Sequence, residues 1–346
     1  MRRHLNTLYV TTENAWLRKD GENAVVSVNR EPQGRVPIHL LGGIVCFGAV
    51  GATPQLIGHC ARKGVSLSFL SRNGRFLARV TGPVSGNVQL RRAQYRSADD
   101  DDMGTSLARD FVLGKLLNQR TVVRRALRDH RSNLDDEARE RLNAGQRRLG
   151  NAARRAANES AKNALRGIEG ESARIYYSVF DDLIRRPDPE FRFESRSRRP
   201  PLNPVNALLS FLYSLLMHDC RSALETVGLD PAVGFLHEDR PGRPSLALDL
   251  MEELRPVLAD RVCLTLINRQ QVSPADFTTA ISGAVTLSDA ARKTLLVTYQ
   301  DRKSRELTHE FLGEKTTLGL VPFVQARLLA RRIRGELDGY PPFIWR

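Results

Sequence analysis

Short segments rich in β-branched and aromatic residues occupy roughly the first eighty positions of the chain. Several alternate apolar and polar residues with a period of two, and turn signals such as Asp20-Gly21 and Asn73-Gly74 separate them, a pattern that predicts strands. The predicted strands cover residues 8–12, 15–17, 24–28, 36–47, 65–70 and 76–80, with one helix over 54–62. Because such short strands bury their apolar faces most simply by packing on one another, we expect a small β-rich domain.

The pattern changes after this region. Residues 81–87 are rich in Gly, Pro and Ser, and from Leu107 onward nearly every segment has helical spacing. The acidic run over 99–102 suits a solvated segment or a helix N-terminus. The sequence therefore predicts the α+β class, with a β-rich N-terminal domain over 1–82, a linker over 83–102 and a larger all-α domain over 103–346.

The composition of the chain indicates what kind of partner it binds and in which cellular compartment it works. A formal net charge of +14 at pH 7 favours a polyanion, and nucleic acid is the first candidate. The four cysteines have no CxxC spacing, which argues against a zinc site or a disulfide framework and suits a reducing cytoplasm. The first residues lack the apolar stretch of a signal peptide. The longest apolar segment, 207–217, is too short to cross a bilayer, so no membrane association is expected.

A carboxylate stands on the apolar face of a predicted helix over 163–184. Glu169 shares this face with four apolar or aromatic residues at steps of three and four, whereas Glu171 is rotated by about 200 degrees on an ideal helix. A buried charge must be paired, protonated or bound to a metal. We therefore expect Glu169 to point inward, either paired with an arginine or ligating a metal, and Glu171 to face elsewhere.

A histidine and two further carboxylates form a second group. Gly234-Phe-Leu-His237 precedes a loop that two prolines keep from being helical. Ser245 is expected to cap the next helix, on which Asp249 and Glu252, at i and i+3, share a face. Taken singly, a histidine or a carboxylate is more often structural than a ligand. Taken together, an imidazole and inward carboxylates suit Mg²⁺ or Mn²⁺.

These residues belong to recognisable motifs. The motifs are Gly167-Ile-Glu169-Gly170 followed by Ala173-Arg174 and Tyr176, Arg199-Pro-Pro-Leu-Asn203-Pro-Val-Asn206, Gly234-Phe-Leu-His237, and Leu248-Asp249-Leu-Met-Glu252. Together they resemble the CRISPR-associated adaptation integrase, the larger of the two core spacer-acquisition proteins. Asn6-Thr-Leu-Tyr-Val-Thr-Thr, Gly74-Arg-Phe-Leu-Ala-Arg and Tyr340-Pro-Pro-Phe-Ile-Trp345 look like its I-C subtype. The resemblance covers essentially the whole chain, and no expected catalytic position is missing.

The resemblance implies a metal-dependent DNA endonuclease and integrase that serves antiviral defence. Such an enzyme joins the 3′-OH ends of short DNA fragments to a repeat array by transesterification. The resemblance also implies that Glu169, His237 and Glu252 bind Mg²⁺ or Mn²⁺ in the helical, catalytic domain. Asp249 is the fourth expected catalytic residue, and it either orients a ligand or recruits a second ion.

The resemblance further implies an assembly. Its expected partners are the DNA fragment, the repeat-array DNA, a second copy of the chain in an asymmetric homodimer, and the smaller adaptation protein bridging two dimers. Because the β-rich domain has strands that need a partner surface and no chemistry-bearing motif of its own, we expect it to form the dimer contact. The subtype adds an iron–sulfur nuclease that trims ends.

Three arginines near the C-terminus are candidates for contact with the DNA backbone. Arg327, Arg331 and Arg334 follow i, i+4, i+7 spacing and so share one helix face. Two other functions fit parts of the pattern. A stand-alone transposase-like integrase would use the same catalytic domain, and a non-catalytic DNA-binding scaffold would need only the basic faces.

Overall fold

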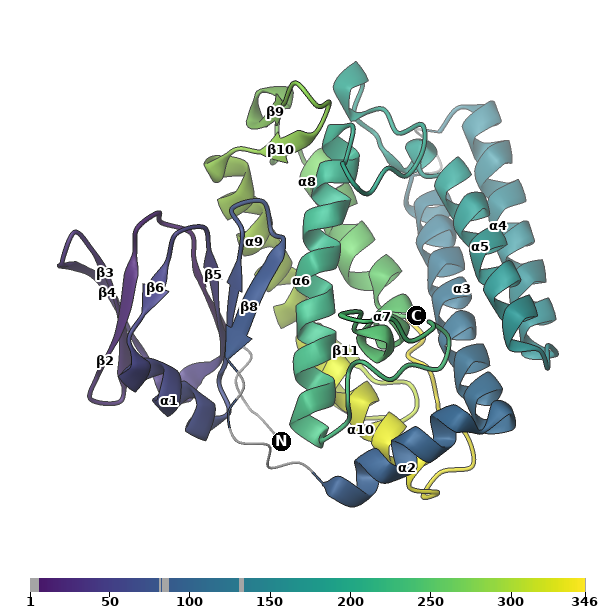
Figure 1. Ribbon diagram of the computed structural model, residues 1–346. Helices are drawn as coiled ribbons and strands as arrows, with labels where there is room; N and C mark the ends of the chain where they lie inside the picture. The colour runs from purple at the N-terminus through teal and green to yellow at the C-terminus, as the bar shows by residue number, and fades with distance from the viewer. Residues whose placement is uncertain (1–5, 81, 83–86, 131–133, 346) are drawn as a thin grey trace. The chain divides into compact units, whose positions relative to one another are not determined.

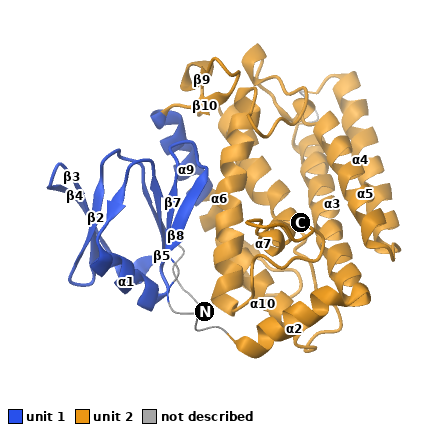
Figure 2. Ribbon diagram, in the orientation of Figure 1, with its two compact units in different colours: residues 1–85, 289–300 blue, residues 86–288, 301–346 orange. Residues whose placement is uncertain are grey.

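The computed structural model describes residues 6–80, 82, 87–130 and 134–345 of the 346-residue chain. The chain divides into two compact units, which Figure 2 colours separately. Unit 1 comprises residues 1–85 and 289–300, and unit 2 comprises residues 86–288 and 301–346. Unit 1 is rich in strands and unit 2 in helices, as Figure 1 shows, so the predicted α+β class is confirmed. Within the described part of the chain, no helix is both long and apolar enough to cross a membrane.

Unit 1 contains two four-stranded sheets among its described residues. The first has the order β1-β5-β7-β8, in which β8 alone is antiparallel to its neighbour, and the second has the order β4-β3-β2-β6. The elements are β1 (Asn6–Val10), β2 (Trp16–Asp20), β3 (Asn23–Val28), β4 (Glu31–Pro37), β5 (Leu41–Phe47), β6 (Gly51–Ala52), α1 (Pro54–Lys63), β7 (Ser66–Leu70) and β8 (Phe76–Val80).

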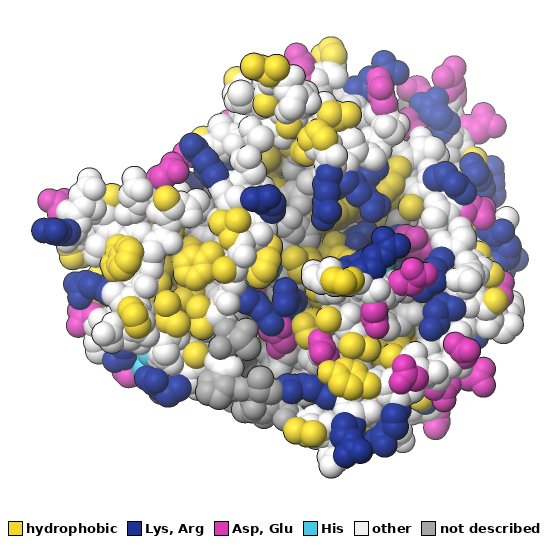
Figure 3. Space-filling view, viewed as in Figure 1, with side chains coloured by type: hydrophobic (Ala, Val, Ile, Leu, Met, Phe, Trp, Pro, Cys, Tyr) yellow, Lys and Arg dark blue, Asp and Glu magenta, His cyan; other side chains and the backbone are white. Residues whose placement is uncertain are grey.

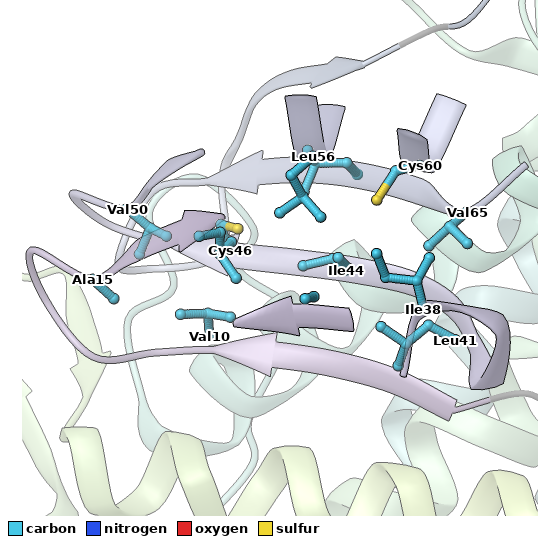
Figure 4. Packing of buried hydrophobic residues seen from close by; sticks show 13 residues of the cluster. Val10, Ala15, Ile38, Leu41, Ile44, Cys46, Val50, Leu56, Cys60 and Val65 are labelled. Atoms are coloured by element: carbon cyan, nitrogen blue, oxygen red, sulfur yellow. The ribbon is translucent and has the colours of Figure 1, made fainter. Parts of the chain in front are cut away.

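Helix α1 completes the core of unit 1. It begins at Thr53, whose side chain accepts a hydrogen bond of 3.3 Å from the Leu56 amide, and it ends at Gly64 in the left-handed conformation (φ 65°). Its inward residues Leu56 and Cys60, one turn apart, are fully buried together with Ile44, as Figure 4 shows. The expected β-rich packing with one helix is therefore present.

The strand prediction differs from the structure most at β4 and β5, while β6 was not predicted and the bounds of β1 and β2 are shifted by up to three residues. The single strand expected over 36–47 is two strands, because a 3-10 turn over Ile38–Leu40 separates β4 from β5. Strand β4 also begins earlier, at Glu31. Its first five residues are exposed and mostly polar, and its identity as a strand comes from antiparallel pairing with β3. Such a strand has no apolar alternation to reveal it.

Unit 2 is built mainly of helices. Its elements are α2 (Val88–Asp99), α3 (Asp101–Asp129), α4 (Asp136–Ala157), α5 (Lys162–Ser178), α6 (Pro204–Val227), α7 (Ser245–Glu252), a π-helical turn (Arg255–Asp260), α8 (Arg261–Asn268), the end of α9 (Asp289–Ser304), α10 (Val321–Ile333), 3-10 turns over Asp181–Leu183, Pro189–Phe191, Pro274–Asp276 and Leu318–Leu320, and the strand pairs β9 (Phe277–Thr279) with β10 (Val285–Leu287) and β11 (Glu306–Thr308) with β12 (Lys315–Thr317). The two short hairpins are additions to the all-α expectation.

Most of the segment expected to be a linker is helix α2. The helix begins at Asn87, whose side chain accepts a hydrogen bond of 3.2 Å from the Leu90 amide. The amide group of Gln94, fully buried, donates to the carbonyls of Asp230 and Val233 at 2.8 and 3.0 Å. The linker prediction is wrong for residues 88–99, because buried polar contacts hold a segment whose composition looked like a connection.

The acidic run and one later segment also bear on the predicted domains. Asp100 caps α3 by accepting a hydrogen bond of 2.9 Å from the Met103 amide, so the run lies at a helix N-terminus as expected.

Residues 289–300 belong to unit 1, although we expected them in the helical domain. Within unit 1, both carboxylate oxygens of Asp289 accept from Arg72 at 2.8 Å. That long-range pairing has no signature in the local sequence.

Candidate metal centre

Helix α7 carries two buried carboxylates. Asp249 and Glu252 lie one turn apart and are 0% and 1% exposed, so they share an inward face as their spacing predicted. The capping prediction for Ser245 is wrong. Ser245 is the first residue of the helix, and its hydroxyl donates to the carbonyl of Glu238 at 2.9 Å, while the cap position is taken by Pro244. Proline has no side-chain acceptor for a capping bond.

Asp249 organises the histidine segment. Its carboxylate accepts hydrogen bonds from the amides of Phe235, Leu236 and His237 at 2.6, 3.0 and 2.9 Å. It also lies 2.6 Å from Nδ1 of His237. A proton on Nδ1 would be held by this carboxylate, which leaves the Nε2 lone pair available to a ligand. Nε2 lies 3.9 Å from Oε1 of Glu252.

Position 234 must be a glycine for a steric reason. A Cβ atom on Gly234 would lie 2.8 Å from Cβ of Ser245 and 2.9 Å from Oδ2 of Asp249. The backbone therefore approaches α7 more closely than any side chain permits. This approach brings the three amides within reach of Asp249.

Glu169 approaches the same place from α5. Its side chain is 27% exposed, and its Oε1 contacts Nζ of Lys115, a residue of α3. The same ammonium lies 2.7 Å from Oε2 of Glu252. Glu171 points elsewhere and pairs with Arg155 at 2.5 Å on the surface, as the helical geometry predicted. The helix itself ends at Ser178, earlier than the expected 184.

Two cations beside the carboxylates were missed by the sequence analysis. Lys115 bridges Glu169 and Glu252, and Arg255, one turn beyond Glu252, lies 3.0 Å from Oε1 of that residue. Burial raises the pKa of Glu252, but the charges of Arg255, Lys115 and His237 outweigh it and hold the pKa below its usual value. Glu252 is therefore ionised at neutral pH. The only local signal was a lysine within an apolar stretch of a predicted helix.

A buried network fixes the end of α7. Glu253 accepts hydrogen bonds of 2.6 Å from the Tyr340 hydroxyl and from the Phe343 amide. Asn118 donates to the carbonyls of Glu253 and Phe343 at 2.7 and 2.8 Å. Burial raises the pKa of Glu253 to about 8, although the hydrogen bonds from Tyr340 and Phe343 to its carboxylate lower it. The C-terminal segment thus anchors the residue next to Glu252.

The donor set suits a divalent cation. Among the described residues, no three His, Cys, Asp or Glu side chains surround one point closely enough to hold an ion, and the Lys115 ammonium contacts both Glu169 and Glu252. Oε2 of Glu252 is buried, and its neighbour at 2.7 Å is the Lys115 ammonium, the group that a bound cation would have to replace. Two carboxylates and an imidazole nitrogen are donors that Mg²⁺ or Mn²⁺ accepts.

The three candidate DNA-contacting arginines form a separate, exposed group. Arg327 and Arg331 lie on α10 and Arg334 follows its last residue. Arg331 and Arg334 pair with Glu336 at 3.2 and 2.5 Å. Two of the three are therefore partly neutralised. Figure 3 shows that Lys and Arg side chains also gather beside α6 and α7 on the face in view.

Comparison with known proteins identifies the family to which this fold and cluster belong. Residues 8–301 match the family described as CRISPR associated protein Cas1. The chain is 54% identical, over 346 residues and 100% of both chains, to the CRISPR-associated endonuclease Cas1 1 of Chlorobaculum tepidum. The chain belongs to the CRISPR-associated Cas1 family. The predicted family and the predicted function, a nuclease of CRISPR adaptation, are confirmed, whereas the I-C subtype stays a prediction.

Solved structures share the fold at low identity. A casposase bound to integration product has a TM-score of 0.82 at 24% identity, with 99% of this chain and 95% of the other covered. A Cas6-RT-Cas1–Cas2 complex contains a chain with a TM-score of 0.82 at 21% identity, with 99% and 36% covered. At this identity the likeness concerns the fold alone.

Proposed function

We propose that the chain is a metal-dependent DNA endonuclease and integrase in which Glu169, His237 and Glu252 bind one Mg²⁺ or Mn²⁺ ion. One observation carries this proposal: side chains from three separate segments converge, since both carboxylates contact the same ammonium and Nε2 of His237 faces Glu252. Asp249 is a positioning residue, because all its contacts hold the histidine segment.

The chain's own groups prepare the site. A divalent ion bound there would polarise the scissile phosphate and make the attacking hydroxyl easier to deprotonate. Asp249 holds Nδ1 of His237, and Arg255 holds Oε1 of Glu252, so both ligands are oriented before substrate arrives. Glu169 and His237 are 27% and 21% exposed, whereas Glu252 is buried. Substrate therefore reaches the centre from the side of Glu169 and His237.

The proposed substrates are a short DNA fragment and a repeat array. The 3′-hydroxyl of the fragment attacks a phosphodiester of the repeat, and the displaced strand leaves with a new 3′-hydroxyl, so no protein nucleophile is needed. The net charge of +14 supports binding of both DNAs. Whole-length identity of 54% to an enzyme named as a CRISPR-associated endonuclease favours this function over a stand-alone transposase or a non-catalytic scaffold.

The proposed assembly holds two such centres apart. The β-rich N-terminal region, 1–82, would join two copies of the chain, and the smaller adaptation protein would bridge two dimers. A chain of the same fold in a complex with Cas2 supports such a bridge. Arg327, Arg331 and Arg334 would contact the DNA backbone, and an iron–sulfur nuclease would trim fragment ends. Four free, buried cysteines suit a cytoplasmic location.

Strand transfer by the purified protein tests the proposal. The protein is incubated with repeat DNA and with a fragment that has either a 3′-hydroxyl or a 3′-deoxy end. Each reaction is run once with Mn²⁺ and once with EDTA. The proposal predicts joined product only with the 3′-hydroxyl and the metal, and none from His237→Ala. Product formed in EDTA, or from the 3′-deoxy fragment, would contradict it.

A further inference from the structure

A buried lysine stands in the middle of the candidate metal centre. Lys115 is 4% exposed, and its Nζ contacts Oε1 of Glu169 and, at 2.7 Å, Oε2 of Glu252. Burial of a charged group is costly unless a partner of opposite charge is close. Here the two partners are the two carboxylates proposed as metal ligands.

The close packing of α3 brings the lysine to this place. A Cβ atom on Gly114 would lie 2.9 Å from Cβ of Glu253 and 3.0 Å from Cβ of Pro342. Glycine therefore lets the backbone of α3 approach the end of α7, next to Glu252. The neighbouring Lys115 then reaches both carboxylates without leaving the helix.

The charges around the ammonium balance. Lys115 and Arg255 carry two positive charges, and Glu169 and Glu252 carry two negative ones. A divalent ion added to this balanced set would leave a net charge of +2, and it would repel the lysine ammonium strongly in a partly buried site. An arriving divalent ion and the lysine ammonium therefore compete for the same oxygens.

We propose that Lys115 is a built-in counter-ion, which holds Glu169 and Glu252 together in the metal-free protein and is displaced when a divalent cation binds. This inference rests on the proposed metal centre. The lysine keeps the empty centre stable and lowers its affinity for metal. The displaced ammonium remains beside the ion, where it adds positive charge for a DNA phosphate.

Replacement of the charge tests this role without a catalytic assay. Lys115→Met keeps the length of the side chain and removes its charge. We expect Mn²⁺ to bind this variant about tenfold more tightly than the wild type, a ratio that corresponds to ~1.4 kcal/mol. In EDTA the variant should melt at a lower temperature than the wild type, and Mn²⁺ should raise its melting temperature more. Calorimetric titration and thermal denaturation measure both effects.

Lys303→Met is the matched control. Lys303 is also buried, and its Nζ lies 2.9 Å from Oδ2 of Asp219 in the same unit. Its loss should lower the melting temperature and leave the Mn²⁺ affinity unchanged. Lys115→Arg, which keeps the charge, should not bind Mn²⁺ more tightly than the wild type.

The outcomes separate this role from the metal centre itself. If His237→Ala weakens Mn²⁺ binding but Lys115→Met does not strengthen it, the counter-ion role is wrong and the metal centre stands. If His237→Ala leaves Mn²⁺ affinity unchanged both in the wild type and in Lys115→Met, the proposed metal centre is wrong.

Should Lys115→Met fail to fold in EDTA, the same measurements are made on Lys115→Gln and on the double variant Lys115→Met with Glu169→Gln. The double variant removes one charge of each sign, so recovery of its melting temperature supports the role and a further loss contradicts it.

Discussion

Replacement of Asp249 should destabilise the histidine segment even when no metal is present. The carboxylate accepts three backbone hydrogen bonds and contacts Nδ1 of His237, and it is fully buried. In Asp249→Ala the three amides lose their acceptor. A buried donor without a partner costs ~1–3 kcal/mol, so the three amides predict a loss of at least ~3 kcal/mol in the free energy of unfolding. For a unit of this size the melting temperature should fall by about 10 °C.

Thermal denaturation in EDTA measures this effect without any contribution from metal. Asp249→Asn keeps one acceptor oxygen, so it should lose about half as much stability. Both variants should also bind Mn²⁺ more weakly, by ~10–100-fold, because the orientation of His237 is lost. If Asp249→Ala melts like the wild type yet binds no Mn²⁺, Asp249 is a ligand and the positioning argument is wrong.

Three further results are expected. Burial raises the pKa of Asp260 to about 6, although a hydrogen bond of 2.7 Å from Tyr213 opposes this, so between pH 4 and 6 the folded chain keeps a proton that the unfolded chain releases. Asp260→Asn, which carries no charge, should therefore melt at a higher temperature than the wild type at pH 8. The difference in melting temperature should shrink at pH 5, and a constant difference would contradict this. Charge reversal of Arg327 and Arg331 together should flatten the salt dependence of DNA affinity, measured by anisotropy, and an unchanged slope would remove that face from the DNA path. Removal of residues before 82 should convert a dimer into monomers in sedimentation, whereas a truncated dimer would place the interface elsewhere.

The sequence predicted the fold where periodicity was strong. Apolar alternation identified most strands of unit 1, and helical spacing identified the helices of unit 2. Strand β4 was missed at its start, because the exposed residues from Glu31 onward pair with β3 without burying a face. Helix α2 was taken for a linker, because its stability comes from contacts such as those of Gln94 with distant carbonyls.

The candidate site was predictable only in part. Resemblance to the family motifs, together with helical spacing, selected Glu169, His237, Asp249 and Glu252 as candidates, and spacing predicted correctly that Asp249 and Glu252 share an inward face. Lys115 was missed. It lies 54 residues before Glu169, and its ion pairs with Glu169 and Glu252 depend on how closely α3 packs against α5 and α7. Local periodicity carries no information on such packing between helices.

The most direct test of the account concerns the convergence of Glu169, His237 and Glu252 on one ion. Strand transfer with Mn²⁺ is measured for the alanine variant of each residue and for Glu171→Ala, with circular dichroism as the check on folding. Glu171 lies on the same helix as Glu169 but pairs with Arg155 at the surface, an interaction worth ~1 kcal/mol or less. The account predicts no product from the three ligand variants and nearly normal product from Glu171→Ala. An inactive Glu171→Ala beside an active Glu169→Ala would contradict it.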